Sequence, residues 1–597
     1  MKRKQILLCA ALLLGAASCR AQPPANSPAP QGGTPLFPGE VRAFKAYGTG
    51  PDSSGFGVMP VSGQPFSDAL RLTTIKEPPR FYDYGATAPL TAAIHKGDVV
   101  WVSLWARRIT SRRESGEAQV EVALLQKVGE REVRPLERVI SFGPQWTQFT
   151  IPFLVRNDSE VGQARLGFRY GYSPQSVEIG GMRLLNFGPN VKLEDLPRTR
   201  VRYDGWAANA PWRKAANERI EKHRKGEVTV RVMDAAGKPV PAAKVQVRMK
   251  RHAFAWGTAI DDTRINDTKD PDNARYHQTV ETYFNKVVIE NSLKWGRWIE
   301  PKYRDQALAS LPWVEARNLP LRGHVMVWPS WQHSPKFLAD LKNDPSALKK
   351  AVSDHIADQT KTLAGRAAEW DVINETYAHH DIIDILGRDI MVDWFRQARL
   401  GAPKSKLFYN DYTMFQKGPG SQYFYDTVKF LKDSGAPIDA IGEQGHFASS
   451  PPGIPDVLAT LDKFGNLGLP IQISEFDIDT DDPGLQTDFM RDFMTAVFSH
   501  PSVMGVMQWG FWEKSHWLPR AALWDANWNL RPHGQVYVDL TTKTWWTNAD
   551  GATKKDGIYK TRAFYGDYEV TVTQGDKSRT QKFTLTPTTT VLRVNLP

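Results

Sequence analysis

Eight short apolar runs alternate with helix-like stretches between residues 251 and 540, and this alternation limits the possible folds more than any other feature of the chain. The runs lie at 254–258, 286–289, 321–327, 369–373, 406–410, 438–442, 470–474 and 503–509. Roughly 290 residues with eight strand–helix repeats match the usual size of a (β/α)8 TIM barrel of the α/β class. A doubly wound parallel sheet is the structural alternative, but no glycine-rich phosphate loop follows the first run. We therefore predict a barrel at 251–540.

Two of these runs end in a glutamate, which strand propensity does not explain because Glu is a poor strand former. Glu375 follows Asn374 at the end of the fourth run, and Glu475 follows the seventh run. The carboxyl ends of barrel strands surround the active site, so both carboxyl groups would face one cleft. Paired carboxyl groups are what glycoside hydrolysis needs, whereas either Glu alone could be a solvated residue at a strand end.

Further polar and aromatic residues collect at the same strand ends. Any one of them could be structural, as a lone His or Trp usually is, but so many strands loaded at one end indicate a binding site. These candidates are Glu290, Asn291, Lys294, His324, Trp328, Asn374, Tyr409, Gln444, His446, Trp509 and Trp517.

Six short motifs follow one another at these strand ends. They are Glu290-Asn291-Ser292-Leu293-Lys294-Trp295, Arg322-Gly323-His324, Trp370-Asp371-Val372-Ile373-Asn374-Glu375, Asn410-Asp411-Tyr412, Gln444-Gly445-His446 and Ser474-Glu475-Phe476-Asp477. In residues and in order they resemble the motifs of glycoside hydrolase family 10, the retaining β-xylanases. The chain departs from the common family pattern after Trp328, where 329–332 stands in place of His-Ser-Gln.

The resemblance implies a retaining endo-1,4-β-xylanase that hydrolyses the xylan backbone by double displacement. Glu375 would be the general acid/base and Glu475 the nucleophile. Closely placed like charges would help to keep Glu375 protonated until it donates its proton. His446 would orient Glu475, while Asn374 and Gln444 would reach sugar hydroxyls.

The resemblance also implies roles for the other candidates. Asn291, Lys294, His324 and Trp328 would line the glycone side of the cleft, and Trp509 and Trp517 would cap it. This chemistry needs neither metal nor cofactor, and we expect none. Two alternatives stay open: a retaining hydrolase of another β-glycan or of decorated xylo-oligosaccharides, and a surface lipoprotein that binds glycan without cleaving it.

The segments around the barrel have the texture of β-structure. Residues 41–189 predict a β-sandwich that resembles jelly-roll carbohydrate-binding modules. Phe168, Tyr170 and Tyr172 alternate there and so share a face, either as a sugar-stacking platform or as core. Residues 190–226 read as a linker, 227–250 as a β-hairpin and 541–597 as a C-terminal β segment. We predict that the last two pack together as one small β-sandwich, since a hairpin alone is marginal.

The N-terminus reads as an export signal. Residues 1–21 are basic and then apolar, and end in a sequence resembling a bacterial lipobox at Cys19; plain cleavage after Ser18 or Ala21 is the alternative. Residues 22–40 are rich in Pro and predict a disordered linker. We therefore expect either an outer-membrane lipoprotein of the bacterial cell envelope, lipidated at Cys19, or a secreted protein.

The charge of the chain argues against nucleic acid as a partner. The formal net charge is +11, but the 76 basic residues are dispersed among 65 acidic ones instead of forming a stripe. We expect a monomer whose partner is a polysaccharide, xylan, and which meets a membrane only through the lipid anchor.

Overall fold

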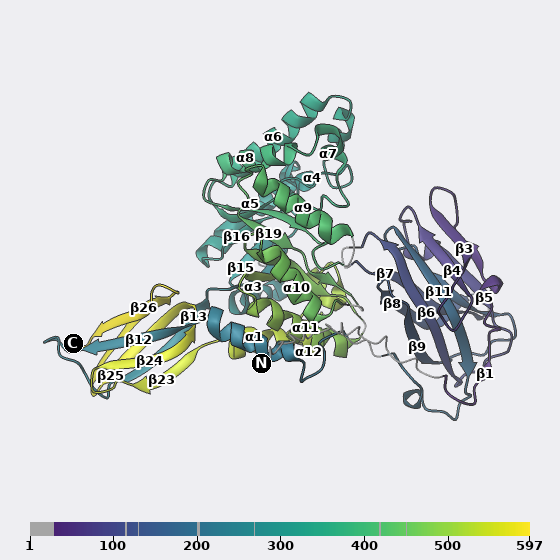
Figure 1. The fold of residues 1–597 in the computed structure, drawn as a ribbon, viewed down its shortest axis with the longest axis horizontal. Coiled ribbons are helices and arrows are strands. Elements are labelled where there is room, and N and C mark those ends of the chain that lie inside the picture. Colours follow the sequence, from purple (N-terminus) through teal and green to yellow (C-terminus); the bar gives the residue numbers. More distant parts are fainter. Residues whose placement is uncertain are drawn as a thin grey trace, which may run out of the picture.

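The computed structural model describes residues 29–113, 116–128, 131–199, 203–267, 269–416, 419–448, 451–480 and 482–597. Three units make up this part of the chain: an N-terminal β-sandwich, a barrel, and a small β-sandwich on the opposite side of the barrel (Figure 1). The predicted signal peptide, Cys19 and most of the predicted linker lie outside the described residues. Among the described helices, none combines the length and the apolar character of a membrane-spanning segment.

The N-terminal unit consists of two antiparallel sheets that face each other. One sheet has the order β3-β4-β11-β6-β9, and β1 pairs with β11; the other has the order β2-β5-β10-β7-β8. The strands of the first sheet are β1 (Thr34–Pro35), β3 (Ser54–Pro60), β4 (Asp68–Thr74), β6 (Val99–Ser111), β9 (Thr147–Leu154) and β11 (Gln175–Asn186). Those of the second are β2 (Lys45–Tyr47), β5 (Gly85–Pro89), β7 (Ala118–Val128), β8 (Arg131–Phe142) and β10 (Ala164–Arg169). The predicted β-sandwich is confirmed.

The sandwich begins earlier than predicted, and the structure decides between the two interpretations of its aromatic residues. It begins earlier than residue 41, because β1 pairs with β11 and both Leu36 and Phe37 are buried in its core. These apolar side chains lie in a Pro- and Gly-rich stretch that reads as a linker. Phe168 and Tyr170 are fully buried between the sheets, so they fill the core and do not form a sugar platform.

Eight parallel strands close into the predicted (β/α)8 barrel. They are β14 (Ala255–Ile260), β15 (Lys286–Ile289), β16 (Leu321–Gly323), β17 (Ala367–Asn374), β18 (Lys406–Asp411), β19 (Ala440–Glu443), β21 (Ile471–Ile478) and β22 (Val503–Gln508). The pairs β14–β22 and β19–β21 complete the ring, and the short β20 (His446–Phe447) pairs in parallel with the end of β21. The strands coincide with the apolar runs because strands buried on both faces need continuous apolar sequence.

Helices surround the barrel and begin at recognisable signals. They are α2 (Asp262–Asn266), α3 (Pro271–Tyr283), α4 (Trp295–Trp298), α5 (Pro301–Ala316), α6 (Pro345–Thr362), α7 (Asp381–Leu386), α8 (Ile390–Gly401), α9 (Pro419–Asp433), α10 (Ile454–Gly465), α11 (Pro483–Ser499) and α12 (Pro532–Asp539). Asp270, Asp344 and Asp482 cap α3, α6 and α11, each followed by a proline in the first turn.

The small sandwich joins the two chain segments that flank the barrel, as predicted. β12 (Lys225–Met233) lies between β24 (Ile558–Phe564) and β27 (Val591–Asn595). β13 (Lys244–His252) pairs with β23 (Asn548–Ala552) and β25 (Gly566–Gln574), and β26 (Lys577–Leu585) pairs with β25. The predicted hairpin is wrong, because β12 and β13 belong to opposite sheets. Alternating apolar residues specify one buried face but not the partner strand.

The segment between the two larger units is fixed to the barrel. Trp206 donates from its indole Nε1 to Asp488 on α11, at 2.8 Å. α1 (Pro211–His223) lies beside α11, where Arg213 binds both carboxylate oxygens of Asp492 at 2.6 Å. This predicted linker is therefore an ordered strap along one side of the barrel in its described part.

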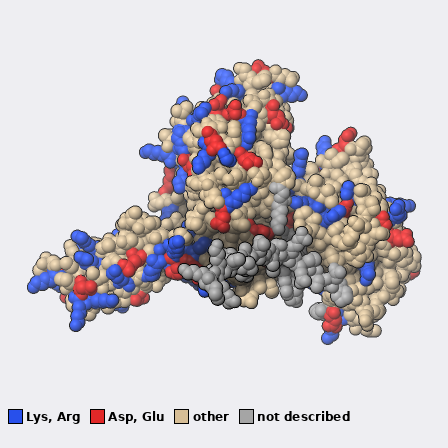
Figure 2. All heavy atoms as spheres, viewed as in Figure 1, with Lys and Arg blue, Asp and Glu red and all other residues tan. Residues whose placement is uncertain are grey.

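The charged side chains on the face drawn in Figure 2 are of both signs, and Lys and Arg are scattered among Asp and Glu over the barrel and the small sandwich. No single-sign stripe crosses that face. Binding by this face would therefore depend on local groups more than on the overall field.

The core of the small sandwich allows a matched stability test. Val572 on β25 is fully buried, whereas Val591 on β27 is 51% exposed. We expect Val572→Ala to lower the free energy of unfolding by about 1.5–3 kcal/mol, because two methyl groups leave a packed interior. Val591→Ala should change it by less than about 0.5 kcal/mol. Chemical denaturation of both variants measures the difference, and equal values would contradict the burial of β25 between two sheets.

Candidate active site

The two predicted carboxyl groups lie at the C-terminal end of the barrel. Glu475 is in β21 and 5% exposed, while Glu375 directly follows β17 and is 2% exposed. Glu375 has a φ of 57°, in the left-handed region that non-glycine residues rarely adopt. Its backbone N–H donates to the carbonyl oxygen of Asn410 at 2.9 Å. Strand β18 thus helps to hold Glu375 in an unusual conformation that turns the chain at the end of β17.

Two asparagine side chains connect the carboxyl groups. Asn410 donates from Nδ2 to Oε1 of Glu475 at 2.9 Å and to Oδ1 of Asn374 at 2.8 Å. Asn374 in turn donates to Oε1 of Glu375 at 3.0 Å. Gln444 donates to the same oxygen at 2.6 Å. The site is therefore one buried hydrogen-bonded network, and a change at one carboxyl group reaches the other through two amides.

Glu475 is held as an anion. Burial alone would raise its pKa, but the charge of His324, the hydrogen bond and charge of His446 and the charge of Lys294 outweigh burial and lower the pKa to about 2. The carboxylate form is therefore present above about pH 2 and is lost only as the pH falls through that value. His446 Nε2 lies 3.4 Å from Glu475 Oε2, as expected for a residue that orients it.

Acidic residues behind the two histidines fix their rings. His446 Nδ1 is 2.9 Å from Asp477, which also accepts a hydrogen bond from Trp517 Nε1 at 2.8 Å. His324 Nδ1 is 3.0 Å from Asp371. Asp477 thus orients the His446 ring from the side opposite to Glu475, whereas His324 directs the same nitrogen, Nδ1, towards Asp371 and, at 4.0 Å, towards Glu475.

A buried ion cluster inside the barrel supports this arrangement. Arg322 bonds to Asp371, and both Arg322 and Lys286 pair with Glu369. Burial raises the pKa of Glu369, yet the charges of Lys286 and Arg322 outweigh it and leave the pKa below its ordinary value. Sequence reasoning did not select these residues as part of the site. The signal was present, because positions 369 and 371 alternate on one strand and so face the barrel interior together.

The residues expected on the glycone side lie close to one another. Lys294 donates to Asn291 Oδ1 at 3.0 Å and lies 5.8 Å from the ring centre of Trp328. His324 meets the ring of Trp509 edge-on at 5.1 Å between centroids. Burial raises the pKa of Glu290 in this region. The departure from the family motif after Trp328 has a structural counterpart, because His333 stacks on that ring at 3.7 Å.

Tyr409 is the exception among the candidates. It is fully buried, and its hydroxyl bonds to Thr376 at 2.5 Å and to Asp411 at 3.0 Å. Its ring packs edge-on against Phe424 on α9. Tyr409 therefore supports the turn after Glu375 from below, and its structural place is beneath the site.

His379 is a neighbour of the acid/base candidate that sequence reasoning missed. Its Nε2 lies 3.5 Å from Glu375 Oε2. Burial lowers the pKa of His379 to about 4, and the charge of Arg112 adds to this effect, while Asp381 opposes it. His379 is thus neutral above that pH and can exchange a hydrogen bond with Glu375. One helical turn brings it there, since its N–H donates to the Glu375 carbonyl oxygen at 3.0 Å.

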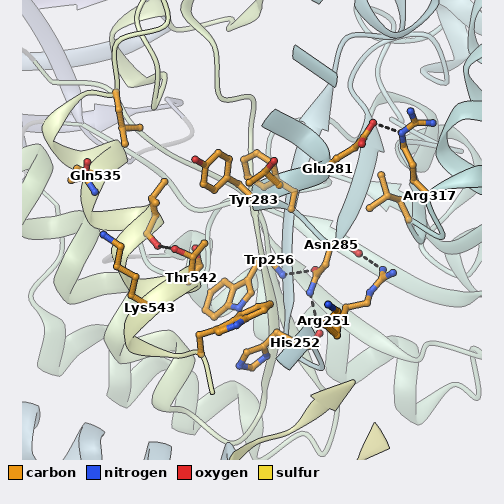
Figure 3. Close-up of a pocket in the computed structure, with 18 residues that line it drawn as sticks. Arg251, His252, Trp256, Glu281, Tyr283, Asn285, Arg317, Gln535, Thr542 and Lys543 are labelled. Atoms are coloured by element: carbon orange, nitrogen blue, oxygen red, sulfur yellow. Dashed lines mark hydrogen bonds and ion pairs between the residues drawn. The ribbon is translucent and has the colours of Figure 1, made fainter. Parts of the chain in front are cut away.

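A second cavity lies at the other end of the barrel and contains none of these residues. Its volume is about 810 Å³, and its lining comes from the barrel and the small sandwich, including Trp256, Tyr283 and Lys543. On the cavity wall, Figure 3 shows the Glu281–Arg317 ion pair and the hydrogen bond that the backbone N–H of Trp256 donates to the side-chain oxygen of Asn285. Barrel active sites lie at the carboxyl ends of the strands, so the site around Glu375 and Glu475 is the better candidate. The described residues include no cluster of three metal-ligating side chains.

The model of glycosyl hydrolase family 10 matches residues 245–539. The barrel belongs to glycosyl hydrolase family 10. This result confirms the resemblance that the strand-end motifs carried.

Individual relatives share the barrel and part of its surroundings. The anti-sigma-I factor RsgI6 of Acetivibrio thermocellus is 33% identical over 62% of this chain and 47% of its own length. Endo-1,4-beta-xylanase 1 of Arabidopsis thaliana is 30% identical over 62% of this chain and 38% of its own. The chain thus spans less than half the length of these two relatives. Xylanase 10B of Thermotoga petrophila, solved with xylobiose, has 24% identity and a TM-score of 0.45 over 49% of this chain and 95% of its own.

The charge of His324 gives a direct test of the electrostatics. We expect His324→Gln to raise the pKa of Glu475 from about 2 towards its ordinary value, because burial then opposes ionisation with less compensation. Carboxyl NMR titration measures this, with the Glu475 signal assigned by its absence in Glu475→Ala. His380→Gln is the matched control, because His380 is a half-exposed histidine in the segment after Glu375. An unchanged pKa in His324→Gln would show that His324 does not stabilise the carboxylate.

Proposed function

We propose that this protein is a retaining endo-1,4-β-xylanase. The observation that carries the proposal is the buried network in which Glu375 and Glu475 are joined by Asn374 and Asn410 but have different surroundings. Retaining hydrolysis needs two carboxyl groups about 5 Å apart, one ionised and one able to donate a proton. The family membership of the barrel and the names of several relatives support the same activity.

The first step would form a bond between Glu475 and the sugar. The Glu475 carboxylate attacks the anomeric carbon, and Glu375 gives its proton to the glycosidic oxygen, so that the bond to the leaving chain breaks. The low pKa of Glu475 supports this assignment, since the nucleophile must be ionised at the working pH. His446 and Asn410 keep both oxygens of Glu475 in fixed directions.

The second step would release the sugar with its original configuration. Glu375, now a carboxylate, takes a proton from water, and the oxygen of that water attacks the anomeric carbon and displaces Glu475. Gln444 and Asn374 donate to one oxygen of Glu375, and His379 lies beside the other. Fixed donors of this kind hold the group in place through both of its protonation states.

Xylan is the substrate that we infer, with cleavage inside the chain. Asn374 and Gln444 lie next to Glu375, where they could meet sugar hydroxyls, and Trp517 offers a ring that is 45% exposed beside His446. We also propose export with a lipid at Cys19, on the sequence of residues 1–21 alone. Cell fractionation of the full chain tests that proposal, with Cys19→Ala expected to move the protein from the membrane to the soluble fraction.

A second candidate function is glycan binding without hydrolysis. One observation leaves room for it, because a relative that is 33% identical over 62% of this chain is named as an anti-sigma factor and not as a hydrolase. Reducing-sugar release by the unsubstituted protein separates the two functions, since a protein that only binds glycan would release none.

Removal of either carboxyl group should abolish most of the activity. We expect Glu475→Ala and Glu375→Gln each to lower kcat/KM on xylan on the order of a thousandfold or more, equivalent to a loss of about 4 kcal/mol of transition-state stabilisation. Reducing-sugar release measures this. Glu281→Gln is the matched control, because Glu281 lines the cavity at the opposite end of the barrel, and it should retain wild-type activity.

Two outcomes would contradict the proposal. Wild-type protein that releases no sugar from xylan or from β-glucans would favour the binding function. Activity that survives Glu475→Ala but is lost in Glu281→Gln would place the chemistry in the other cavity.

A further inference from the structure

The N-terminal sandwich touches the barrel at its catalytic end. Tyr412, which directly follows β18, donates from its hydroxyl to the carbonyl oxygen of Arg112 at 3.5 Å. Gln416 donates to the carbonyl oxygen of Arg113 at 3.4 Å. Both arginines lie in the connection between β6 and β7. In Figure 1 the sandwich presents β7 and β8 to the barrel.

A second contact lies beside the strand that carries Glu475. A small groove of about 50 Å³ is lined by Arg138, Phe149 and Thr199 of the sandwich side and by Thr480 and Asp482, which follow β21. The sandwich therefore meets the loops after β18 and β21, on the side of the barrel ring that is away from β15. Asn291 and Lys294 follow β15, so this contact lies across the mouth from the expected glycone side.

Arg112, which directly follows β6, is close to the acid/base candidate. The charge of Arg112 contributes to the lowered pKa of His379, and His379 lies 3.5 Å from Glu375 Oε2. Arg108 is likewise near Tyr377, two residues after Glu375. An acid/base protonates the oxygen of the leaving chain, so side chains beside Glu375 face the leaving, or aglycone, part of the substrate.

Arg112 is available for a ligand. Its side chain is exposed, and among the described residues its guanidinium has no hydrogen-bond or ion-pair partner. The neighbouring guanidiniums are occupied: Arg108 donates to the Gly116 carbonyl oxygen and Arg113 to the side chain of Gln119. Arg520 at the same junction pairs with Asp479. An unpaired guanidinium can bind a planar carboxylate through two parallel hydrogen bonds.

We propose that Arg112 forms an aglycone subsite for the carboxylate of a uronic-acid side group on the xylan chain, so that the N-terminal sandwich is part of the active-site cleft. The inference rests on the proposed function and deepens it by naming the decorated, anionic substrate class. It also gives the sandwich a function at the site that differs from capture of a distant glycan chain. The uronic acid would sit on a sugar that leaves with the aglycone, beside Glu375.

The activity test compares anionic and neutral substrates. We expect Arg112→Gln to lower the ratio of kcat/KM on glucuronoxylan to kcat/KM on unsubstituted xylan by about fivefold, the effect of one partly exposed ion pair. Added salt should lower the wild-type ratio towards that of the variant, because it screens exposed charges. Arg112→Lys should keep part of the preference.

Arg131→Gln is the matched control. Arg131 is exposed at the start of β8, where it pairs with Val128 at the end of the β7–β8 ladder opposite to the barrel contact. Its ratio should equal that of wild type. A wild-type ratio in Arg112→Gln would overturn the proposal. If that ratio came with an equal loss of kcat/KM on both substrates, Arg112 would only hold the connection in place.

A binding test separates this proposal from the proposed function. Calorimetric titration of Glu475→Ala with an acidic xylo-oligosaccharide and with its neutral counterpart should show tighter binding of the acidic one, and the double variant with Arg112→Gln should lose that difference. The titration can be read even if the wild-type protein hydrolyses nothing, in which case only the hydrolase assignment fails. Equal affinities for the two ligands in Glu475→Ala would overturn the subsite.

Discussion

The side-chain amide of Asn410 is the link on which the geometry of the site depends. One Nδ2 group donates to both Glu475 and Asn374, and its carbonyl oxygen Oδ1 accepts from Ser474 at 2.6 Å, which fixes the orientation of the amide. The main-chain carbonyl oxygen of the same residue holds Glu375 in its left-handed conformation. One residue of β18 thus sets the relative positions of two carboxyl groups that lie on different strands.

A chain of buried charges continues the hydrogen-bonded network of the site into the interior of the barrel. Glu369, Arg322 and Asp371 form a buried chain of ion pairs that ends at His324, and His324 lowers the pKa of Glu475. Buried ion pairs contribute little net stability compared with apolar residues of similar size. Their presence in the centre of the barrel is better explained by the fixed field that they provide at the Glu475 carboxylate.

Sequence patterns predicted those parts of the structure that depend on local chain properties. Apolar runs located the strands, and glutamates at strand ends pointed to the candidate site, because both signals lie within a few residues. The roles of Asn410 and Asp371 depend on which strands become neighbours, so residue type alone did not reveal them. The hairpin of β12 and β13 was wrong for the same reason. Leu36 and Phe37 were missed because their Pro- and Gly-rich surroundings hid two core residues, and the place of Arg112 follows only from the docking of two separate units.

The most direct measurement is to trap the sugar on the enzyme. An activated 2-deoxy-2-fluoro-xylobioside serves this purpose. Its fluorine slows both steps of a double displacement, while its good leaving group speeds the first step, so that the glycosyl-enzyme accumulates. We predict that the intact mass of the protein rises by one fluoroxylobiosyl group and that peptide mapping places this group on Glu475. An adduct on another residue would contradict the assignment of the nucleophile. Hydrolysis of xylan with inversion at the anomeric carbon, and with no adduct at any residue, would contradict the double displacement itself.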